Sequence, residues 1–187
     1  NITKEHLDYH KTWENYAFTK TRLITSYLKP KASIVYNKDN SDANKYISQV
    51  LKHIDKKLNV VSYAYSNNPR TAQLTATKDK PNVSYEIPIT VSYNRKMDSS
   101  LSTKYSVLST KLSIIGDYNV QNFLGALGAV MILGENIEKA TNAIQSLPNL
   151  KGRMNILQKE PFMIIVDFAH TPNALEQALK SLTSLPH

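Results

Sequence analysis

The segment from Phe162 to Leu182 places a short apolar stretch directly before a turn and a helix. The four apolar residues 163–166 predict a fully buried strand, and Pro172 opens the helix that follows. A buried strand that leads into a helix is typical of α/β sheets, which bind ligands beyond the carboxyl ends of their strands. Three polar residues lie at that position: Asp167, His170 and Thr171. The apolar face predicted for the helix consists of Leu175, Ala178, Leu179 and Leu182.

The first third of the chain alternates between helical and strand patterns. Apolar spacing predicts a helix at 13–28 and a second at 42–57, the latter capped by Ser41 or Asp42. Short β-rich runs at 32–36 and 60–65 predict strands. The expected fold class is therefore α/β, with a mostly parallel sheet flanked by helices.

The middle of the chain has a different composition. Residues 70–115 are rich in Thr, Ser, Tyr and Val, with period-2 patches such as 83–87, and predict three or four antiparallel strands. We expect these strands to form a small antiparallel sheet near 66–115. Two further helices are predicted at 119–133 and 137–147.

Composition excludes several classes of protein. The 187 residues correspond to one domain or slightly more, and zero Cys excludes disulfides and thiolate metal sites. No apolar run reaches the length of a transmembrane helix, so we expect no membrane contact. The net charge of +8 comes from scattered Lys residues rather than a dense basic stripe, so we expect no nucleic-acid partner.

Lys20 is the unusual residue of the first helix. Helical spacing places it on the same face as Trp13, Ala17 and Ile24, which predicts that it points inward. A buried ammonium costs several kcal/mol unless it is paired or modified. The alternative is that its long stem carries the charge to the edge of the apolar stripe.

The segment before this helix resembles a signature of the Mur ligases, the ATP-dependent ligases that build the peptidoglycan stem peptide. Residues 1–10 read Asn-Ile-Thr-Lys-Glu-His-Leu-Asp-Tyr-His, and His6 precedes Lys20 by the spacing of the MurE type, the UDP-N-acetylmuramoyl-tripeptide synthetases. The resemblance implies that His6 binds Mg²⁺ and that Lys20 is carbamylated, which would turn a cation into an oxygen ligand suited to this metal. Glu5 and Lys11 depart from the family pattern.

Three further strings resemble Mur ligase elements in the same order. They are Gly116-Asp-Tyr-Asn-Val-Gln-Asn122, Leu150-Lys-Gly-Arg-Met154 and the hinge string from Asp167 to Leu175. Asn155 departs from the second element, where Glu is usual. The resemblance implies that Asn119, Asn122 and Arg153 hold the adenine of ATP. It also implies that Asp167 contacts the ribose and that His170 and Thr171 lie near the phosphates. We expect Asn119, Asn122, Arg153 and Asp167 to converge on one crevice at the strand ends.

The resemblance also implies a domain arrangement and a reaction. Residues 1–171 correspond to the second part of a central ATP-binding domain, and 172–187 to a hinge helix leading to a C-terminal domain outside the chain. The implied parent enzyme is cytoplasmic, uses ATP and Mg²⁺, and joins an amino acid to a UDP-N-acetylmuramoyl peptide through an acyl phosphate. The chain contains no Gly-x-x-x-x-Gly-Lys-Ser/Thr phosphate loop, so we expect it to be inactive alone.

Two alternatives remain open at this stage. One is a related ATP-dependent ligase of the folate polyglutamate or cyanophycin type, whose hinge would more often read Gly-His-Asn-Pro than the Ala-His-Thr-Pro of 169–172. The other is a non-catalytic Mur-like binding module that keeps the ligase core without a phosphate loop.

Overall fold

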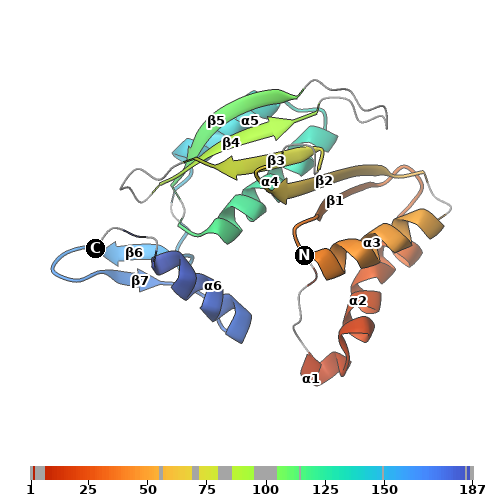
Figure 1. Ribbon diagram of the computed structural model, residues 1–187, viewed down its shortest axis with the longest axis horizontal. Coiled ribbons are helices and arrows are strands. Elements are labelled where there is room, and N and C mark those ends of the chain that lie inside the picture. The colour runs from red at the N-terminus through yellow and green to blue at the C-terminus, as the bar shows by residue number, and fades with distance from the viewer. Residues whose placement is uncertain are drawn as a thin grey trace.

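The computed structural model describes residues 2, 7–54, 57–68, 72–79, 86–94, 105–113, 115–148, 150–183 and 185. A five-stranded sheet forms the upper layer of the molecule in Figure 1, and a two-stranded sheet lies apart from it. The strands of the large sheet, in spatial order, are β1 (Ser33–Asn37), β2 (Asn59–Tyr65), β3 (Leu74–Lys78), β4 (Ile87–Tyr93) and β5 (Ser106–Leu112).

The large sheet is mixed. β1 pairs with β2 and β2 with β3 in parallel, whereas β3–β4 and β4–β5 are antiparallel. The antiparallel strands expected between 66 and 115 therefore exist, but they extend the parallel strands instead of forming a sheet of their own. The predicted patch at 83–87 lies mostly outside the described residues. The α/β fold class is confirmed, and the separate small antiparallel sheet is formed by β6 (Asn155–Gln158) and β7 (Ile164–Val166).

Helices cover both faces of the parallel half of the sheet. Their order along the chain is α1 (Leu7–His10), α2 (Trp13–Arg22) continued by the π-helical turn η1 (Leu23–Tyr27), α3 (Ser41–His53), α4 (Asp117–Ile132), α5 (Ile137–Ala143) continued by the 3-10 turn η2 (Ile144–Ser146), and α6 (Pro172–Leu182). α4 and α5 pack on one face, with apolar residues of β2 to β5. α2 and α3 pack on the opposite face, against Ile34 of β1.

The predicted helices are present with small differences at their ends. α3 begins one residue earlier than expected, because the side chain of Asn40 accepts a 2.9 Å hydrogen bond from the amide of Ala43. The predicted caps, Ser41 and Asp42, were therefore wrong. An Asn in extended conformation just before a helix satisfies an amide that has no partner within the helix.

α4 makes a close contact with the sheet. Val120, Leu124 and Leu127 are at most 1% exposed and lie in the core with Val61 of β2. A Cβ added at Gly128 would lie 2.6 Å from Cγ1 of Val35, inside van der Waals distance. Gly128 therefore lets the helix approach the sheet.

The β6–β7 hairpin corrects one expectation. The strand at 163–166 was predicted to be fully buried, but Ile164 and Val166 are 38% and 42% exposed. Within the described part of the chain β7 pairs with β6 alone, so only its alternate residue, Ile165, packs inward against the cluster that contains Ala178 of α6. A strand with one covered face buries every second residue.

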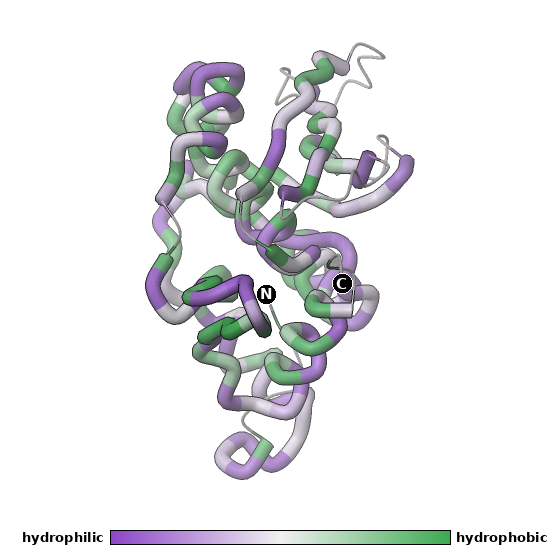
Figure 2. The backbone as a smooth tube through the Cα atoms, turned by 90° about the vertical axis from the view of Figure 1, so that its left-hand side faces the viewer, coloured by the Kyte–Doolittle hydropathy of each residue, from purple (hydrophilic) through white to green (hydrophobic). Residues whose placement is uncertain are grey.

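α6 shows the same half-covered packing. Ala178 is buried and Leu182 packs against it, whereas Leu175 and Leu179 are 51% and 55% exposed. The predicted apolar face is thus only half in contact with the rest of the described structure. Among the described residues, no helix is both long and apolar enough to cross a membrane, and Figure 2 shows hydrophobic stretches interrupted by hydrophilic residues along the tube.

We predict that Gly128→Ala destabilises the chain by about 1–3 kcal/mol, because the new methyl group must displace the stiff side chain of Val35. Gly125→Ala is the matched control in the same helix. The atom nearest to its new Cβ would be the Tyr63 hydroxyl oxygen, at 3.4 Å. The higher helix propensity of Ala should therefore stabilise the Gly125→Ala variant by up to about 1 kcal/mol. Urea unfolding of both variants measures the difference, and equal effects would contradict the close contact.

Candidate functional site

Several of the predicted site residues gather around Tyr118, in the first turn of α4. Burial raises the pKa of the Tyr118 phenol most, and the Asp167 carboxylate adds to the rise. A hydrogen bond with the Asn119 side chain and the charge of Arg153 lower the pKa by smaller amounts. Asn119, Arg153 and Asp167 therefore lie around one phenol, although Asn119 and Asp167 are 48 positions apart in the sequence.

The packing under Tyr118 brings two parts of the chain together. Ile115, Met154 and Ala178 form a small buried cluster against which Tyr118 and Ile165 pack. This cluster holds the start of α4 against the β6–β7 hairpin and α6. A pocket of about 270 Å³ at the junction is lined by Ser113, Ile115, Met154 and residues 156–159.

Asp167 organises the turn after β7. One carboxylate oxygen, Oδ1, accepts from the amide of Ala169 at 2.8 Å, and the other, Oδ2, accepts from the amide of Met154 at 2.8 Å. The second bond crosses from β7 to the residue before β6, whose φ of 44° is unusual for a non-glycine residue. Asp167 therefore holds the turn that carries Arg153, and among the contacts of the described residues each of its oxygens accepts one hydrogen bond.

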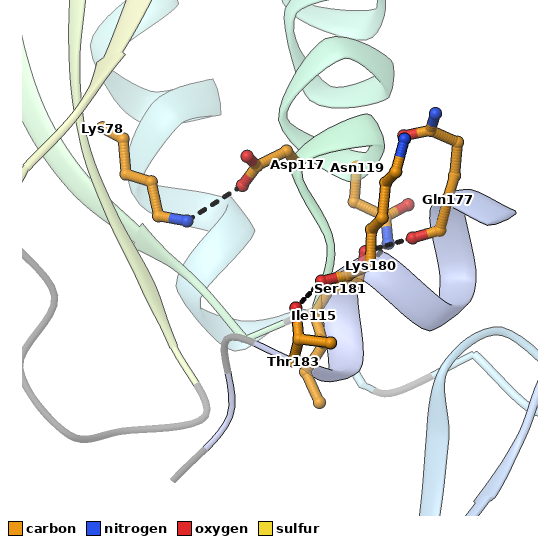
Figure 3. Close-up of polar contacts among 8 residues, drawn as sticks. All are labelled: Lys78, Ile115, Asp117, Asn119, Gln177, Lys180, Ser181 and Thr183. Carbon is orange, nitrogen blue, oxygen red and sulfur yellow. Dashed lines mark hydrogen bonds and ion pairs between the residues drawn. The ribbon is translucent and has the colours of Figure 1, made fainter.

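The two asparagines of α4 are neighbours, as their i, i+3 spacing predicted. The side-chain amide of Asn122 donates to Oδ1 of Asn119 at 3.2 Å, and Asn119 in turn donates to the carbonyl of Ile115 at 2.7 Å. Figure 3 shows the second bond at the start of α4, close to α6. Asn119 is not the N-cap; Gly116 is, with a φ of 104° that favours glycine.

The hinge string lies next to this group. The guanidinium of Arg153 lies 5.0 Å from the centroid of the Phe168 ring, which in turn meets the His170 ring edge to face at 4.9 Å. Nδ1 of His170 lies 2.9 Å from the carbonyl of Phe168. Thr171 caps α6, because its Oγ1 accepts from the amide of Ala174 at 3.2 Å. The predicted helix beginning at Pro172 is confirmed.

Lys20 corrects another expectation, since its side chain is exposed rather than inward. The buried residues of α2 are Tyr16, Ala17 and Thr21, and Lys20 lies beside them with its Nζ 5.4 Å from the centroid of the Tyr16 ring. The flexible stem of lysine lets a strongly hydrated ammonium leave an apolar stripe for water and for an aromatic face.

The predicted magnesium ligands are not brought together by what the structure describes. His6 lies outside the described residues, and an unmodified Lys20 ammonium cannot ligate a cation. Within the described ranges no group of three or more His, Cys, Asp or Glu side chains could hold a metal ion. The roles of His6 and Lys20 remain predictions from the family resemblance.

A second polar cluster, which the sequence analysis did not identify, lies where β1 ends. Asp39 accepts through Oδ2 from the amide of Tyr65 at 2.8 Å and from the side-chain amide of Gln121 at 3.3 Å. Asn37 donates to Oε1 of Gln121 at 3.2 Å. Burial raises the pKa of Asp39, and the hydrogen bond from Tyr65 partly opposes the rise. An acidic residue two positions beyond the end of a strand was the available signal, similar to the one that identified Asp167 directly after β7.

Residues 1–130 match the family description "Mur ligase middle domain". The chain belongs to this family. The diaminopimelate-adding ligase of Nostoc sp., named UDP-N-acetylmuramoyl-L-alanyl-D-glutamate–2,6-diaminopimelate ligase, is 35% identical over 185 residues, which are 97% of this chain and 33% of the relative. The Mur ligase resemblance, and its closeness to the MurE type, are confirmed.

Solved structures agree with this assignment. A structure of a UDP-N-acetylmuramoyl-L-alanyl-D-glutamate–2,6-diaminopimelate ligase superposes with a TM-score of 0.71 at 25% identity, covering 99% of this chain and 34% of that one. Folylpolyglutamate synthetase from Lactobacillus casei superposes with a TM-score of 0.60 at 17% identity, covering 94% of this chain and 41% of that one, which shows a shared fold. The chain spans about a third of the length of the relatives it matches.

The raised pKa of Asp39 predicts a pH-dependent stability. Because the folded pKa lies above the unfolded value of about 3.9, the folded state binds the proton more tightly, and stability falls as pH rises through this interval. Asp39→Asn keeps an oxygen at the Oδ2 position and cannot ionise. We expect the free energy of unfolding of the variant, relative to that of the wild type, to be higher at about pH 7 than at about pH 3.5. Urea unfolding of both proteins at the two pH values measures this difference. A variant that loses stability relative to the wild type as pH rises would contradict the effect of burial on Asp39.

Proposed function

We propose that the full-length protein containing this chain is an ATP-dependent amide ligase that adds an amino acid to a UDP-N-acetylmuramoyl peptide in the cytoplasm. The observation that carries the proposal is a set of contacts at the start of α4: Tyr118 packs against the cluster that contains Met154, and the amide of Met154, the residue after Arg153, donates to Asp167. Asn119, next to Tyr118, accepts from Asn122 in the same helix. Similarity to the Nostoc ligase over almost the whole chain supports the choice of substrate class.

In this proposal the polar residues near Tyr118 hold the nucleoside of ATP. The amides of Asn119 and Asn122 offer both donors and acceptors to the edge of adenine. Arg153, already seated on the Phe168 ring, can stack on a second aromatic plane. Asp167 would accept from a ribose hydroxyl through a remaining lone pair while its backbone contacts keep it in place.

The hinge residues would lie near the phosphates. Thr171 caps α6, so the exposed amides at that helix end carry partial positive charge that favours anions. His170 is exposed beside them.

In the proposed reaction the terminal phosphoryl group of ATP passes to the substrate carboxylate. The amine of the amino acid then attacks the acyl phosphate, forming the amide and releasing phosphate.

Binding of Mg²⁺ by His6 and a carbamylated Lys20 belongs to the same proposal. Lys20 is exposed in its helix, so its amine is accessible to carbon dioxide. The carbamate would add an oxygen ligand of the kind that Mg²⁺ binds and would remove the positive charge. The metal would neutralise phosphate charge during phosphoryl transfer.

The observations favour a peptidoglycan ligase over a folate polyglutamate ligase. In superpositions of solved structures, identity to folylpolyglutamate synthetase is 17%, against 25% to a diaminopimelate-adding ligase. The hinge string at 169–172 also differs from the Gly-His-Asn-Pro type. The residues proposed to bind adenine, Asn119, Asn122 and Arg153, follow the order of the family elements. Their presence argues against a non-catalytic binding module.

We predict that Asn122→Ala in the full-length enzyme raises the ATP KM about ten- to a hundredfold, the equivalent of losing about 1–3 kcal/mol from one unpaired polar contact. The KM for the UDP-linked peptide should stay unchanged. Steady-state kinetics with each substrate varied in turn measures both constants. Glu138→Ala, a surface change on α5, is the control. An unchanged ATP KM would exclude Asn122 from the nucleotide site.

We predict that Lys20→Ala abolishes ligation in the full-length enzyme while the far-ultraviolet circular dichroism spectrum stays that of the wild type, because the side chain is exposed and only its ammonium lies near the core residue Tyr16. Added acetate or formate should restore part of the activity by supplying the missing carboxylate-like oxygens. Lys45→Ala, on α3, is the control for loss of a positive charge. Full activity of the Lys20 variant would leave it an ordinary surface lysine.

A further inference from the structure

We propose that Asp39 is a positioning residue for the nucleotide site, acting through Gln121 on the first turns of α4. The inference rests on the proposed function and adds a residue to it. Asp39 lies in the turn after β1, and its Oδ2 accepts from both Tyr65 and Gln121.

Gln121 connects this turn to the helix that carries Asn119 and Asn122. It follows Asn119 by two positions, or about 200° around an α-helix, so its side chain leaves on a different side of the helix. Both ends of its amide are used: Oε1 accepts from Asn37 and Nε2 donates to Asp39. Gln121 thus holds one side of α4 while the asparagines occupy another.

The ring of contacts is closed. Oδ1 of Asn37 accepts from the amide of Asp39 at 2.8 Å, so Asn37, Asp39 and Gln121 contact one another in turn. Asn37 is 7% exposed. The bond from the Tyr65 amide adds the end of β2 to the ring. Two parallel strands and one helix are therefore joined at the edge where open α/β sheets bind ligands.

Directional bonds add to the apolar packing of α4. Val120 and Leu124 bury one face of the helix, and the close contact of Gly128 with Val35 lies about two turns beyond Gln121. Hydrogen bonds weaken steeply with angle and therefore define rotation. A second tie, the 3.1 Å pair between Lys78 and Asp117 shown in Figure 3, is exposed and should contribute little.

The geometry also separates a positioning role from ligand binding. Oδ2 of Asp39 and both polar atoms of the Gln121 side chain already have protein partners. These contacts hold the first turns of the helix in place, whereas Asn122 is exposed four residues after Tyr118. Loss of Asp39 should therefore change nucleotide binding through α4 and leave the other substrate site unaffected.

Kinetics of the full-length enzyme tests this. Asp39→Ala removes both contacts and should raise the ATP KM about two- to tenfold, the fold-change expected for a lost hydrogen bond, with the KM for the UDP-linked peptide unchanged. Asp39→Asn keeps an acceptor at the Oδ2 position and should stay within about twofold of the wild type. Asp42→Ala removes an exposed carboxylate three positions away and is the matched control.

A double-mutant cycle distinguishes positioning from general destabilisation. If Asp39 acts through α4, Asp39→Ala should change the ATP KM little when Asn122→Ala is already present. If the two substitutions raise the ATP KM independently, so that their fold-changes multiply in the double mutant, the inference is overturned. A wild-type ATP KM in Asp39→Ala would also overturn it, and both outcomes leave the proposed function standing. A wild-type enzyme that does not consume ATP would overturn both. If Asp39→Ala fails to fold, Gln121→Leu removes the same contact from the helix side and carries the same expectations.

Discussion

The close packing of α4 on the parallel strands is the constraint on which the rest of the structure depends. Gly128 lets the helix approach Val35, and the apolar residues on the same helix complete the core with β2 to β5. Once this contact is made, the first turn of α4 lies at the carboxyl ends of β1, β2 and β3. Asn119, Gln121 and Asn122, three of the residues proposed to hold or position a nucleotide, lie in the first two turns of this helix.

Two kinds of interaction set the site at the start of α4. The cluster of Ile115, Met154 and Ala178 brings the β6–β7 hairpin and α6 to the helix by apolar burial. The polar ring of Asn37, Asp39 and Gln121 fixes the other side of the helix by directional bonds. Apolar burial brings the elements together, and in our proposal the hydrogen bonds determine which side chains face the nucleotide.

Local patterns predicted the elements and several contacts because both depend on residues close in the sequence. The i, i+3 pair Asn119–Asn122 and the helix at Pro172 are of this kind. The predictions that Lys20 points inward and that the strand at 163–166 is fully buried were wrong for the same reason. Helical spacing and apolar runs indicate which face a residue shares, but burial depends on what covers that face.

By itself the sequence determined the α/β class, the family and the order of the motifs, since these depend on periodicity and on strings of neighbouring residues. The tertiary structure alone decided that β3 to β5 continue the parallel strands and that Tyr118 lies among Asn119, Arg153 and Asp167. It alone joined Asp39 to Gln121, 82 positions away. Such pairs meet only after long loops close around a packed core, and no local pattern records that closure.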